Sequence, residues 1–249
     1  MKVLFSPSEG KKSGGSAEPF NHSDFIFPDL FDKRKEVIDR YKSFIDQADD
    51  TQLSKLFGIK DSSKFGTYTN DIYTQPTMKV IERYSGVAFE YLKYETLQSR
   101  EKEYVDKNTI IFSNLFGPLY AGDQHLPEYK LKQGEKIDGF APEIFYKKHF
   151  SDALDDLLQG EPFLDLRAGF YNKFYKAKTP YTTLKFVKNG KVVSHWAKAY
   201  RGIVLRELAI NDIASVNDFR KMDIENLMVK EIQEKGIHTE IIFDIINDH

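Results

Sequence analysis

Short apolar runs alternate with helical stretches along nearly the whole chain of 249 residues. The apolar runs that predict strands cover residues 2–6, 109–113, 163–167 and 239–245. Between them, apolar side chains recur at the helical period of three to four residues. Strands alternating with helices are typical of an α/β sheet. We therefore expect a single compact α/β domain over residues 1–249, with a mixed sheet, flanking helices and a basic cleft.

Most of the predicted helices precede the second strand. Helical periodicity is found over residues 29–46, 51–57, 77–92, 142–158 and 197–211. The first three predict a mainly helical insertion at about residues 29–105. After the second strand, residues 114–137 carry Gly and Pro and are expected to form a long loop.

A hairpin is predicted near the middle of the second half of the chain. Two strands, at residues 182–187 and 192–196, flank a segment that contains Asn189 and Gly190. Asn-Gly favours a type I′ turn, because that turn needs a positive φ at both central residues.

The segment from Leu166 to Arg206 contains ten Lys or Arg residues and no Asp or Glu. Cations interleaved with aromatic rings are typical of nucleic-acid and nucleotide sites, since cations contact phosphates and rings stack on bases. A solvated basic face above an aromatic core explains the same pattern. The cations are Arg167, Lys173, Lys176, Lys178, Lys185, Lys188, Lys191, Lys198, Arg201 and Arg206.

The overall composition narrows the class of protein. A net charge of -2 excludes a uniformly basic protein, so a polyanion site must be a local patch. The absence of Cys excludes disulfides and thiolate metal sites, and the six His are scattered. We therefore expect no metal and no cofactor. No apolar run reaches the length of a membrane span, so we also expect a cytoplasmic protein without membrane association.

Several candidate site residues follow the ends of predicted strands. Lys11 lies in the loop after the first strand, and Arg167 ends the strand at residues 163–167. Open α/β sheets bind ligands at the carboxyl ends of their strands, so both cations are candidates for contact with an anion. Asp165 points the same way as Arg167, either to orient it or to act as a general base.

Lys198 and Arg201 are expected in the first turn of the helix at residues 197–211. The amino end of a helix is electropositive, so two cations there oppose the helix dipole. A bound anion, held by both side chains and by free backbone N–H groups, would reverse that repulsion. All four cations are therefore predicted to face one cleft.

A second candidate phosphate contact is the segment around Gly58 and Lys60. It resembles half of a helix-hairpin-helix, in which a Gly-rich turn offers backbone N–H groups to phosphate. One of the two usual glycines is replaced by Lys60, and an ordinary helix end with a Gly cap explains the segment as well.

Taken together, five segments resemble the YaaA family of peroxide-stress proteins. They are Ser6 and Pro7 with Lys11, residues 112–119, residues 123–134, Asp165 to Arg167 with Tyr171, and Ala197 and Lys198 with Arg201 and Gly202. The sequence departs from the family where Ala121 and Gly122 replace a frequent Arg-Pro and where Lys130 replaces Arg. Lys130 keeps the charge but loses the bidentate geometry of Arg.

The resemblance implies a basic cleft with a helix-hairpin-helix, a cytoplasmic location, DNA binding without strong sequence preference and protection from iron-driven damage during peroxide stress. Lys11, Lys130, Arg167, Lys198 and Arg201 are then the residues expected to contact duplex or branched DNA. The alternative is an enzyme that acts on a nucleotide or phosphorylated small molecule, with the same cations as an anion clamp and Asp165 as general base. An open groove would favour DNA, and an enclosed pocket would favour the small ligand.

Overall fold

The computed structural model describes residues 1–246, apart from the side chains of Ser194 and His195. The main sheet has the strand order β4-β3-β1-β6-β7-β10-β9, with β8 paired to β7, and β2 and β5 form a separate ribbon. The strands are β1 (Val3–Phe5), β2 (Thr77–Met78), β3 (Thr109–Ser113), β4 (Gly117–Tyr120), β5 (Leu126–Pro127), β6 (Phe163–Asp165), β7 (Tyr181–Lys188), β8 (Lys191–Val192), β9 (Leu227–Lys235) and β10 (His238–Ile245).

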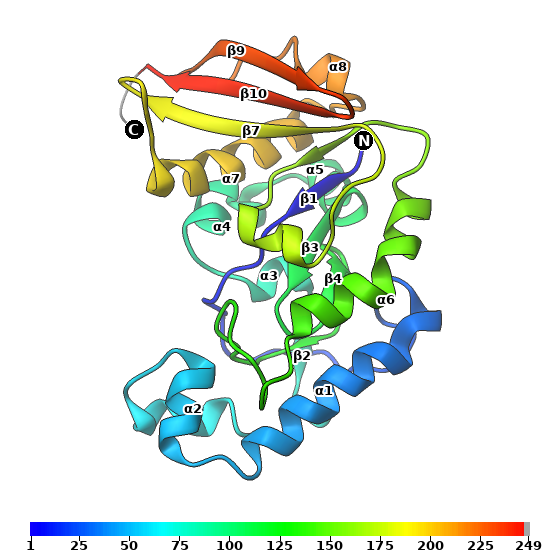
Figure 1. Ribbon diagram of the computed structural model, residues 1–249, viewed down its shortest axis with the longest axis vertical. Helices are drawn as coiled ribbons and strands as arrows, with labels where there is room; N and C mark the ends of the chain where they lie inside the picture. Colours follow the sequence, from blue (N-terminus) through cyan, green and yellow to red (C-terminus); the bar gives the residue numbers. More distant parts are fainter. Residues whose placement is uncertain (247–249) are drawn as a thin grey trace.

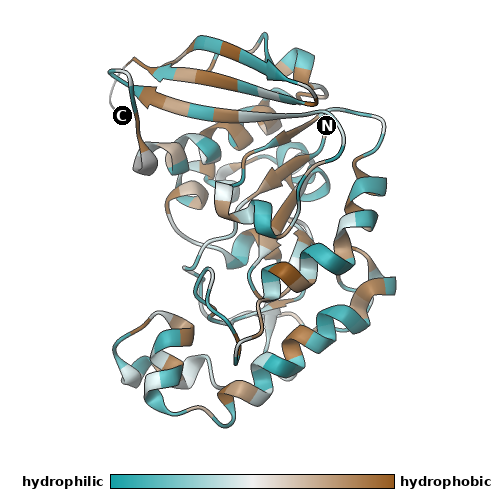
Figure 2. Ribbon diagram, viewed as in Figure 1, coloured by the Kyte–Doolittle hydropathy of each residue, from teal (hydrophilic) through white to brown (hydrophobic). Residues whose placement is uncertain are grey.

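Five neighbouring strands, β3, β1, β6, β7 and β10, run parallel, and the edge strands β4 and β9 run antiparallel to them. The three inner strands β1, β3 and β6 are buried along their whole length. In a strand that is covered on both faces, side chains pointing either way are buried. The sequences of such strands are therefore nearly unbroken apolar runs instead of alternating polar and apolar residues. Figure 2 shows this as hydrophobic colouring along the centre of the sheet.

The helices cover both faces and extend the molecule at one end. They are α1 (Phe31–Ile45), α2 (Asp50–Phe57), α3 (Val80–Arg83), α4 (Val87–Leu92), α5 (Ser99–Asn108), α6 (Pro142–Leu157), α7 (Ser194–Ile210) and α8 (Val216–Phe219). In Figure 1, α7 lies along β7, β9 forms the outer edge of the sheet, and α1 and α2 lie at the opposite end of the molecule. Four 3-10 turns, η1 to η4, cover Pro28–Leu30, Ser62–Thr67, Tyr94–Thr96 and Gly169–Lys173.

The predicted α/β class is confirmed by the mixed sheet and its flanking helices. Helices α1, α2 and α6 match the predictions for residues 29–46, 51–57 and 142–158 to within a few residues. The hairpin turn also has the expected backbone, with φ of 50° at Asn189 and 75° at Gly190. No helix in the described part of the chain is long and apolar enough to span a membrane.

Other predictions were wrong in ways that local backbone geometry explains. The single helix expected over residues 77–92 is β2, α3 and α4, because Tyr84 is extended and Gly86 takes a φ of 108°. The loop at residues 114–137 contains β4 and β5, and the second hairpin strand ends at Val192. Strand β9 was not predicted, since it is exposed along most of its length and carries mixed charges.

Helix α7 packs closely against α4 at Gly202. A Cβ atom built on Gly202 would lie 2.0 Å from the carbonyl oxygen of Ala88, which is backbone and cannot move aside. Glycine is therefore required where the two helices cross, and the contact places the residue before it, Arg201, beside the start of α4.

We expect Gly202→Ala to lower the free energy of unfolding by about 1 to 3 kcal/mol, because it overpacks this crossing. Chemical denaturation monitored by circular dichroism would measure the change. Gly66→Ala is the matched control, since a Cβ on Gly66 meets nothing within 4 Å and its φ is not positive. Equal stability of the two variants would contradict this account of the crossing.

Candidate anion-binding site

The candidate site lies where β1 and β6 end side by side. Strand β1 lies between β3 and β6 in the sheet. The chain continues from β1 toward β3 on one side, whereas from β6 it continues to β7 on the other side. The connections after β1 and β6 therefore diverge, which leaves a crevice outside their carboxyl ends. Such a switch point is the usual ligand site of an open α/β sheet.

Side-chain hydrogen bonds fix the loops around this crevice. The Ser6 hydroxyl accepts a hydrogen bond of 2.8 Å from the backbone N–H of Ala168, joining the loops that follow β1 and β6. The Ser8 hydroxyl accepts one from the backbone N–H of Gly10. A carboxylate oxygen of Glu9 accepts the backbone N–H of Gln133 at 3.1 Å. The walls of the crevice are thus built from three separate parts of the chain.

The crevice forms a pocket of about 400 Å³ that contains Lys198 and Arg201. Lys198 is exposed and Arg201 is half-buried. Burial lowers the pKa of Arg201, while the charge of Asp165 acts in the opposite direction. Among the described residues, no hydrogen bond or ion pair engages the Arg201 guanidinium. The other lining residues are Phe5, Ser6, Pro7, Ser8, Glu9, Gly86, Val87, Ala88, Phe89, Gln133, Leu166, Ala168 and Tyr171.

The position of Lys198 and Arg201 on their helix differs from the prediction. Helix α7 begins at Ser194, three residues before the expected start, so Lys198 lies in its second turn and Arg201 at the start of its third. The helix dipole acts mainly within the first turn, and the argument from reversed charge at the helix end does not hold. The two cations share the pocket because they are spaced i, i+3 on one face of α7.

Arg167 forms a buried ion pair with Asp165 beneath the pocket. Its Nε donates to Asp165 Oδ1 at 2.9 Å, and one terminal nitrogen donates to Oδ2 at 2.7 Å. The same guanidinium donates to the backbone oxygens of Tyr171 and Tyr175 and stacks on the ring of Phe112. The side chain of Arg167 is only 1% exposed, so this cation holds the loop after β6 instead of facing the crevice.

Lys11 does not line the pocket, but it contacts Ser8, which does. Its Nζ is 4.0 Å from the ring centre of Tyr129 and 5.3 Å from that of Tyr84. The amine makes one long hydrogen bond of 3.4 Å, to the backbone oxygen of Ser8. Lys130 approaches the same turn and donates to the backbone oxygen of Glu9 at 3.0 Å. Lys11 and Lys130 therefore adjoin the pocket through the backbone of residues 8 and 9.

Most aromatic side chains of the basic segment belong to the core. Tyr171, Phe174, Tyr175, Phe186 and Tyr200 are all at most 2% exposed, so they offer no stacking surface to a base. For these rings, the interpretation as an aromatic core is the correct one.

Several cations of the segment have partners of their own. Lys178 pairs with Asp155, and Arg206 donates to the backbone oxygens of Leu92 and Lys93. The basic segment thus places only part of its charge at the crevice.

The segment around Gly58 has the geometry of a capped helix end. Gly58 takes the left-handed conformation, with φ of 67°, and donates its N–H to the backbone oxygen of Ser54 at the end of α2. The next element is the 3-10 turn η2. Lys60 lies in the intervening turn and is exposed.

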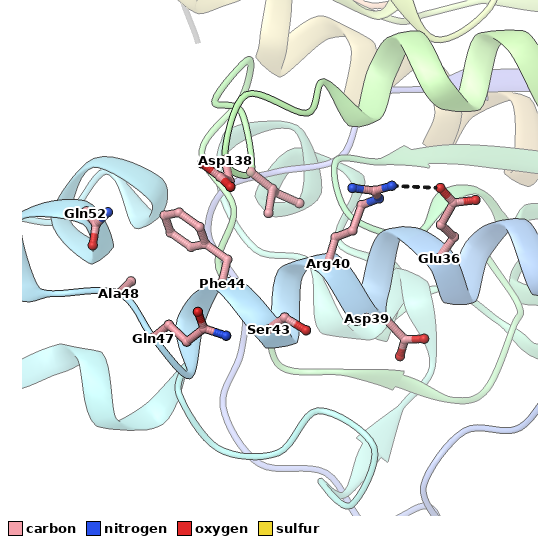
Figure 3. A pocket seen from close by; sticks show the side chains of 10 residues that line it. Glu36, Asp39, Arg40, Ser43, Phe44, Gln47, Ala48, Gln52 and Asp138 are labelled. Atoms are coloured by element: carbon pink, nitrogen blue, oxygen red, sulfur yellow. Dashed lines mark hydrogen bonds and ion pairs between the residues drawn. The ribbon is translucent and has the colours of Figure 1, made fainter.

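A larger hollow of about 640 Å³ lies along α1, and Figure 3 shows its lining. Three acids, Glu36, Asp39 and Asp138, line it together with Arg40. Arg40 is paired with Glu36 at 3.2 Å, as the dashed line in Figure 3 marks. Its acidic lining makes this hollow unsuited to a polyanion, in spite of its size.

The sequence profile described as peroxide stress protein YaaA matches residues 1–233. The chain belongs to the YaaA family. This confirms the resemblance drawn from the segments around Lys11, Arg167 and Arg201.

Relatives within the family cover nearly the whole chain. A protein of Campylobacter jejuni subsp. jejuni is 48% identical over 99% of this chain and 100% of its own length. A UPF0246 protein of Corynebacterium glutamicum is 30% identical over 97% of this chain and 98% of its own. A UPF0246 protein of Clostridioides difficile is 24% identical over 93% and 95%.

The structure brings in residues that the sequence did not single out. Ser8 and Glu9 line the pocket, and Tyr84 and Tyr129 contact the Lys11 amine. Tyr129 lies within the YaaA-like segment at residues 123–134, which was the available signal for it. Nothing in the sequence pointed to Tyr84, which reaches Lys11 because their backbones form an isolated bridge.

We expect Asp165→Ala to lower the free energy of unfolding by about 3 to 5 kcal/mol, because it leaves the buried Arg167 charge without its partner. Urea denaturation would measure the difference. Asp152→Ala serves as control, since Asp152 contacts Lys178 at 3.6 Å with its side chain 98% exposed. Such a surface pair contributes at most about 1 kcal/mol. A loss no larger than that of the control would show that Arg167 does not depend on Asp165.

Proposed function

We propose that this chain acts during peroxide stress in the cytoplasm by binding duplex or branched DNA without strong sequence preference. In this proposal it helps protect DNA from iron-driven oxidative damage. The family supports the stress role, and protection from iron is what membership of the family implies. The observation that carries the DNA-binding part is the Arg201 guanidinium, which lies half-buried in the crevice with no partner among the described residues.

An unpartnered, partly dehydrated guanidinium is suited to a phosphate group. Two phosphate oxygens would accept two of the five N–H donors of Arg201 at once. Lys198 adds an exposed charge one turn away on the same helix face. Contacts of this kind neutralise phosphates and do not read bases, which accounts for binding without strong sequence preference.

The remaining cations have supporting roles in this proposal. Lys130 extends the positive surface beyond Glu9, and Lys11 lies just behind it. Arg167 supports the site through the loop after β6. The exposed Lys60, in the turn after Gly58, adds a phosphate contact farther along the molecule, where the sequence resembles a helix-hairpin-helix.

The pocket volume favours a second candidate, an enzyme that acts on a nucleotide or phosphorylated small molecule. About 400 Å³ is within the range of small-molecule sites, and the pocket lies at the switch point of the sheet. Asp165 is a weak candidate for the general base, because both of its carboxylate oxygens are occupied by Arg167.

We expect Lys198→Ala with Arg201→Ala to leave the fold intact and to weaken DNA binding by roughly 1 to 3 kcal/mol for each lost phosphate contact. Fluorescence anisotropy with a labelled duplex, measured from low to physiological salt, would give both the affinity and its salt dependence. The double variant should show a shallower slope, because fewer counterions are released.

Lys230→Ala with Lys235→Ala is the matched control, because it removes the same charge from the exposed edge strand β9. Equal affinity of the two double variants would defeat the assignment of the site. No binding of any DNA by the unmodified chain, with binding of a labelled nucleotide that depends on Arg201, would establish the enzyme candidate instead.

A further inference from the structure

The main sheet ends in two edge strands that differ in length and exposure. Strand β4 is short and buried except at its last residue, whereas β9 has nine residues and is exposed along most of its length. Figure 1 shows β9 as the outer edge of the sheet, and no described strand pairs with its outer side. The backbone N–H and C=O groups of an exposed edge strand can pair with another strand. Strand β9 is therefore the open edge of this fold.

The pairing of β9 with β10 shows which backbone groups of β9 point outward. Residues of an antiparallel pair alternate between those that exchange hydrogen bonds with the neighbouring strand and those that face away from it. The two-residue turn at 236–237 joins Lys235 to His238, and such a turn closes on a hydrogen-bonded pair. Lys235 and every second residue before it therefore face β10. The backbone N–H and C=O groups of Ile232 and Glu234 point outward, where no described backbone group bonds to them.

A β-bulge limits the length over which β9 can pair with another strand. The register with β10 shifts by one residue at Lys230, between Ile242 and Phe243. A bulge twists an edge strand and, like an exposed lysine, usually protects it from pairing. Residues 231–235 lie beyond the bulge and keep a regular ladder with β10. A partner strand would therefore pair with residues 231–235.

This segment is complementary to itself in charge. When two copies pair antiparallel over the whole of 231–235, the two-fold axis passes through the central residue, Gln233. Glu231 of each copy then lies opposite Lys235 of the other, and Ile232 lies opposite Glu234. Opposite charges that face each other across two strands stabilise the pair, and like charges destabilise it. The lysine that protects the edge from other strands thus meets a carboxylate in a second copy.

Glu231 and Lys235 are available for this contact. Both are exposed, and neither takes part in an ion pair within the part of the chain that the structure describes. Four residues of strand separate them by about 13 Å, so they cannot pair within one copy. Ile232 is 45% exposed and would lie diagonally across from Ile232 of the other copy. The pairing would therefore also cover apolar surface.

We propose that β9 pairs with β9 of a second copy of this chain, antiparallel and two-fold symmetric over residues 231–235. The two sheets join into one, and Ile232 and Glu234 of opposite copies exchange backbone hydrogen bonds. A single strand pair covers less surface than a standard interface, so the dimer forms and dissociates with concentration. Strands β7 and β10 lie between β9 and the crevice at the ends of β1 and β6. The proposal does not depend on DNA binding, and its failure would leave the proposed function untouched.

Disulfide capture tests the pairing directly, because the chain has no Cys. Gln233→Cys places one thiol of each copy at the two-fold axis, in a pair whose Cα atoms are about 4.5 Å apart and within reach of a disulfide. We expect mild oxidation to convert most of this variant to a species of twice 28.9 kDa on a non-reducing gel. Val229→Cys is the matched control, since it is exposed on the same strand but its two thiols would lie more than about 20 Å apart. Equal capture of both variants, or capture of neither, would overturn the proposal.

Charge reversal tests the register by sedimentation equilibrium across a concentration series. Glu231→Lys and Lys235→Glu should each raise the dimer Kd about tenfold, because each replaces two opposite-charge pairs with two like-charge pairs. Combining them exchanges the signs and should return the Kd to near that of the unmodified chain. Lys221→Glu, at an exposed lysine outside β9, controls for net charge and should leave the Kd unchanged.

The recovery separates pairing from a general effect on the fold, since Glu231 and Lys235 do not touch within one copy. An unmodified chain that stays monomeric at every concentration would overturn the proposal. A double variant that associates no more tightly than the single variants would overturn it as well.

Discussion

The buried pair of Asp165 and Arg167 is the interaction on which the rest of the site depends. It joins the end of β6 to the turn η4 through the backbone oxygens of Tyr171 and Tyr175, and it reaches β3 through the ring of Phe112. Two charges removed from water must satisfy each other or destabilise the fold. This pair lies next to the crevice and fixes the loop after β6. In that loop the backbone N–H of Ala168 donates a hydrogen bond to the Ser6 hydroxyl.

The fixed loops place the Arg201 guanidinium in the crevice and the Lys11 amine against Ser8, one of the residues that line it. Arg201 remains charged at any physiological pH and has no described partner, so it is suited to hold an anion. Burial lowers the pKa of Lys11, whose amine contacts the backbone oxygen of Ser8. Ser8 connects the two, since it lines the pocket of Arg201 and its backbone oxygen accepts the hydrogen bond of Lys11.

Sequence patterns predicted those parts of the fold that a single local property determines, such as burial of a strand or the backbone conformation of a turn. Buried strands such as β1, β3 and β6 appear as apolar runs, and Asn189 with Gly190 specifies the hairpin turn. Strand β9 could not be predicted, because an exposed edge strand needs no apolar face. In the site, Lys198 and Arg201 line one pocket, as predicted for a shared cleft, whereas Lys11 contacts Ser8 without lining that pocket. The burial of Arg167 could not be predicted from the sequence, because a charged side chain usually stays exposed to water. Its contacts with the ring of Phe112 and with two backbone carbonyl groups arise only in the folded chain.

The order of the strands has a consequence for synthesis of the chain. Strand β1 is made first, yet its partners β3 and β6 begin about one hundred and one hundred and sixty residues later. Lys198 and Arg201 follow later still, on α7. Contacts so distant in sequence form slowly, because a long loop must close before they stabilise anything. A nascent chain released before α7 therefore has the loop of Lys11 but no crevice, and the site appears only when the protein is almost complete.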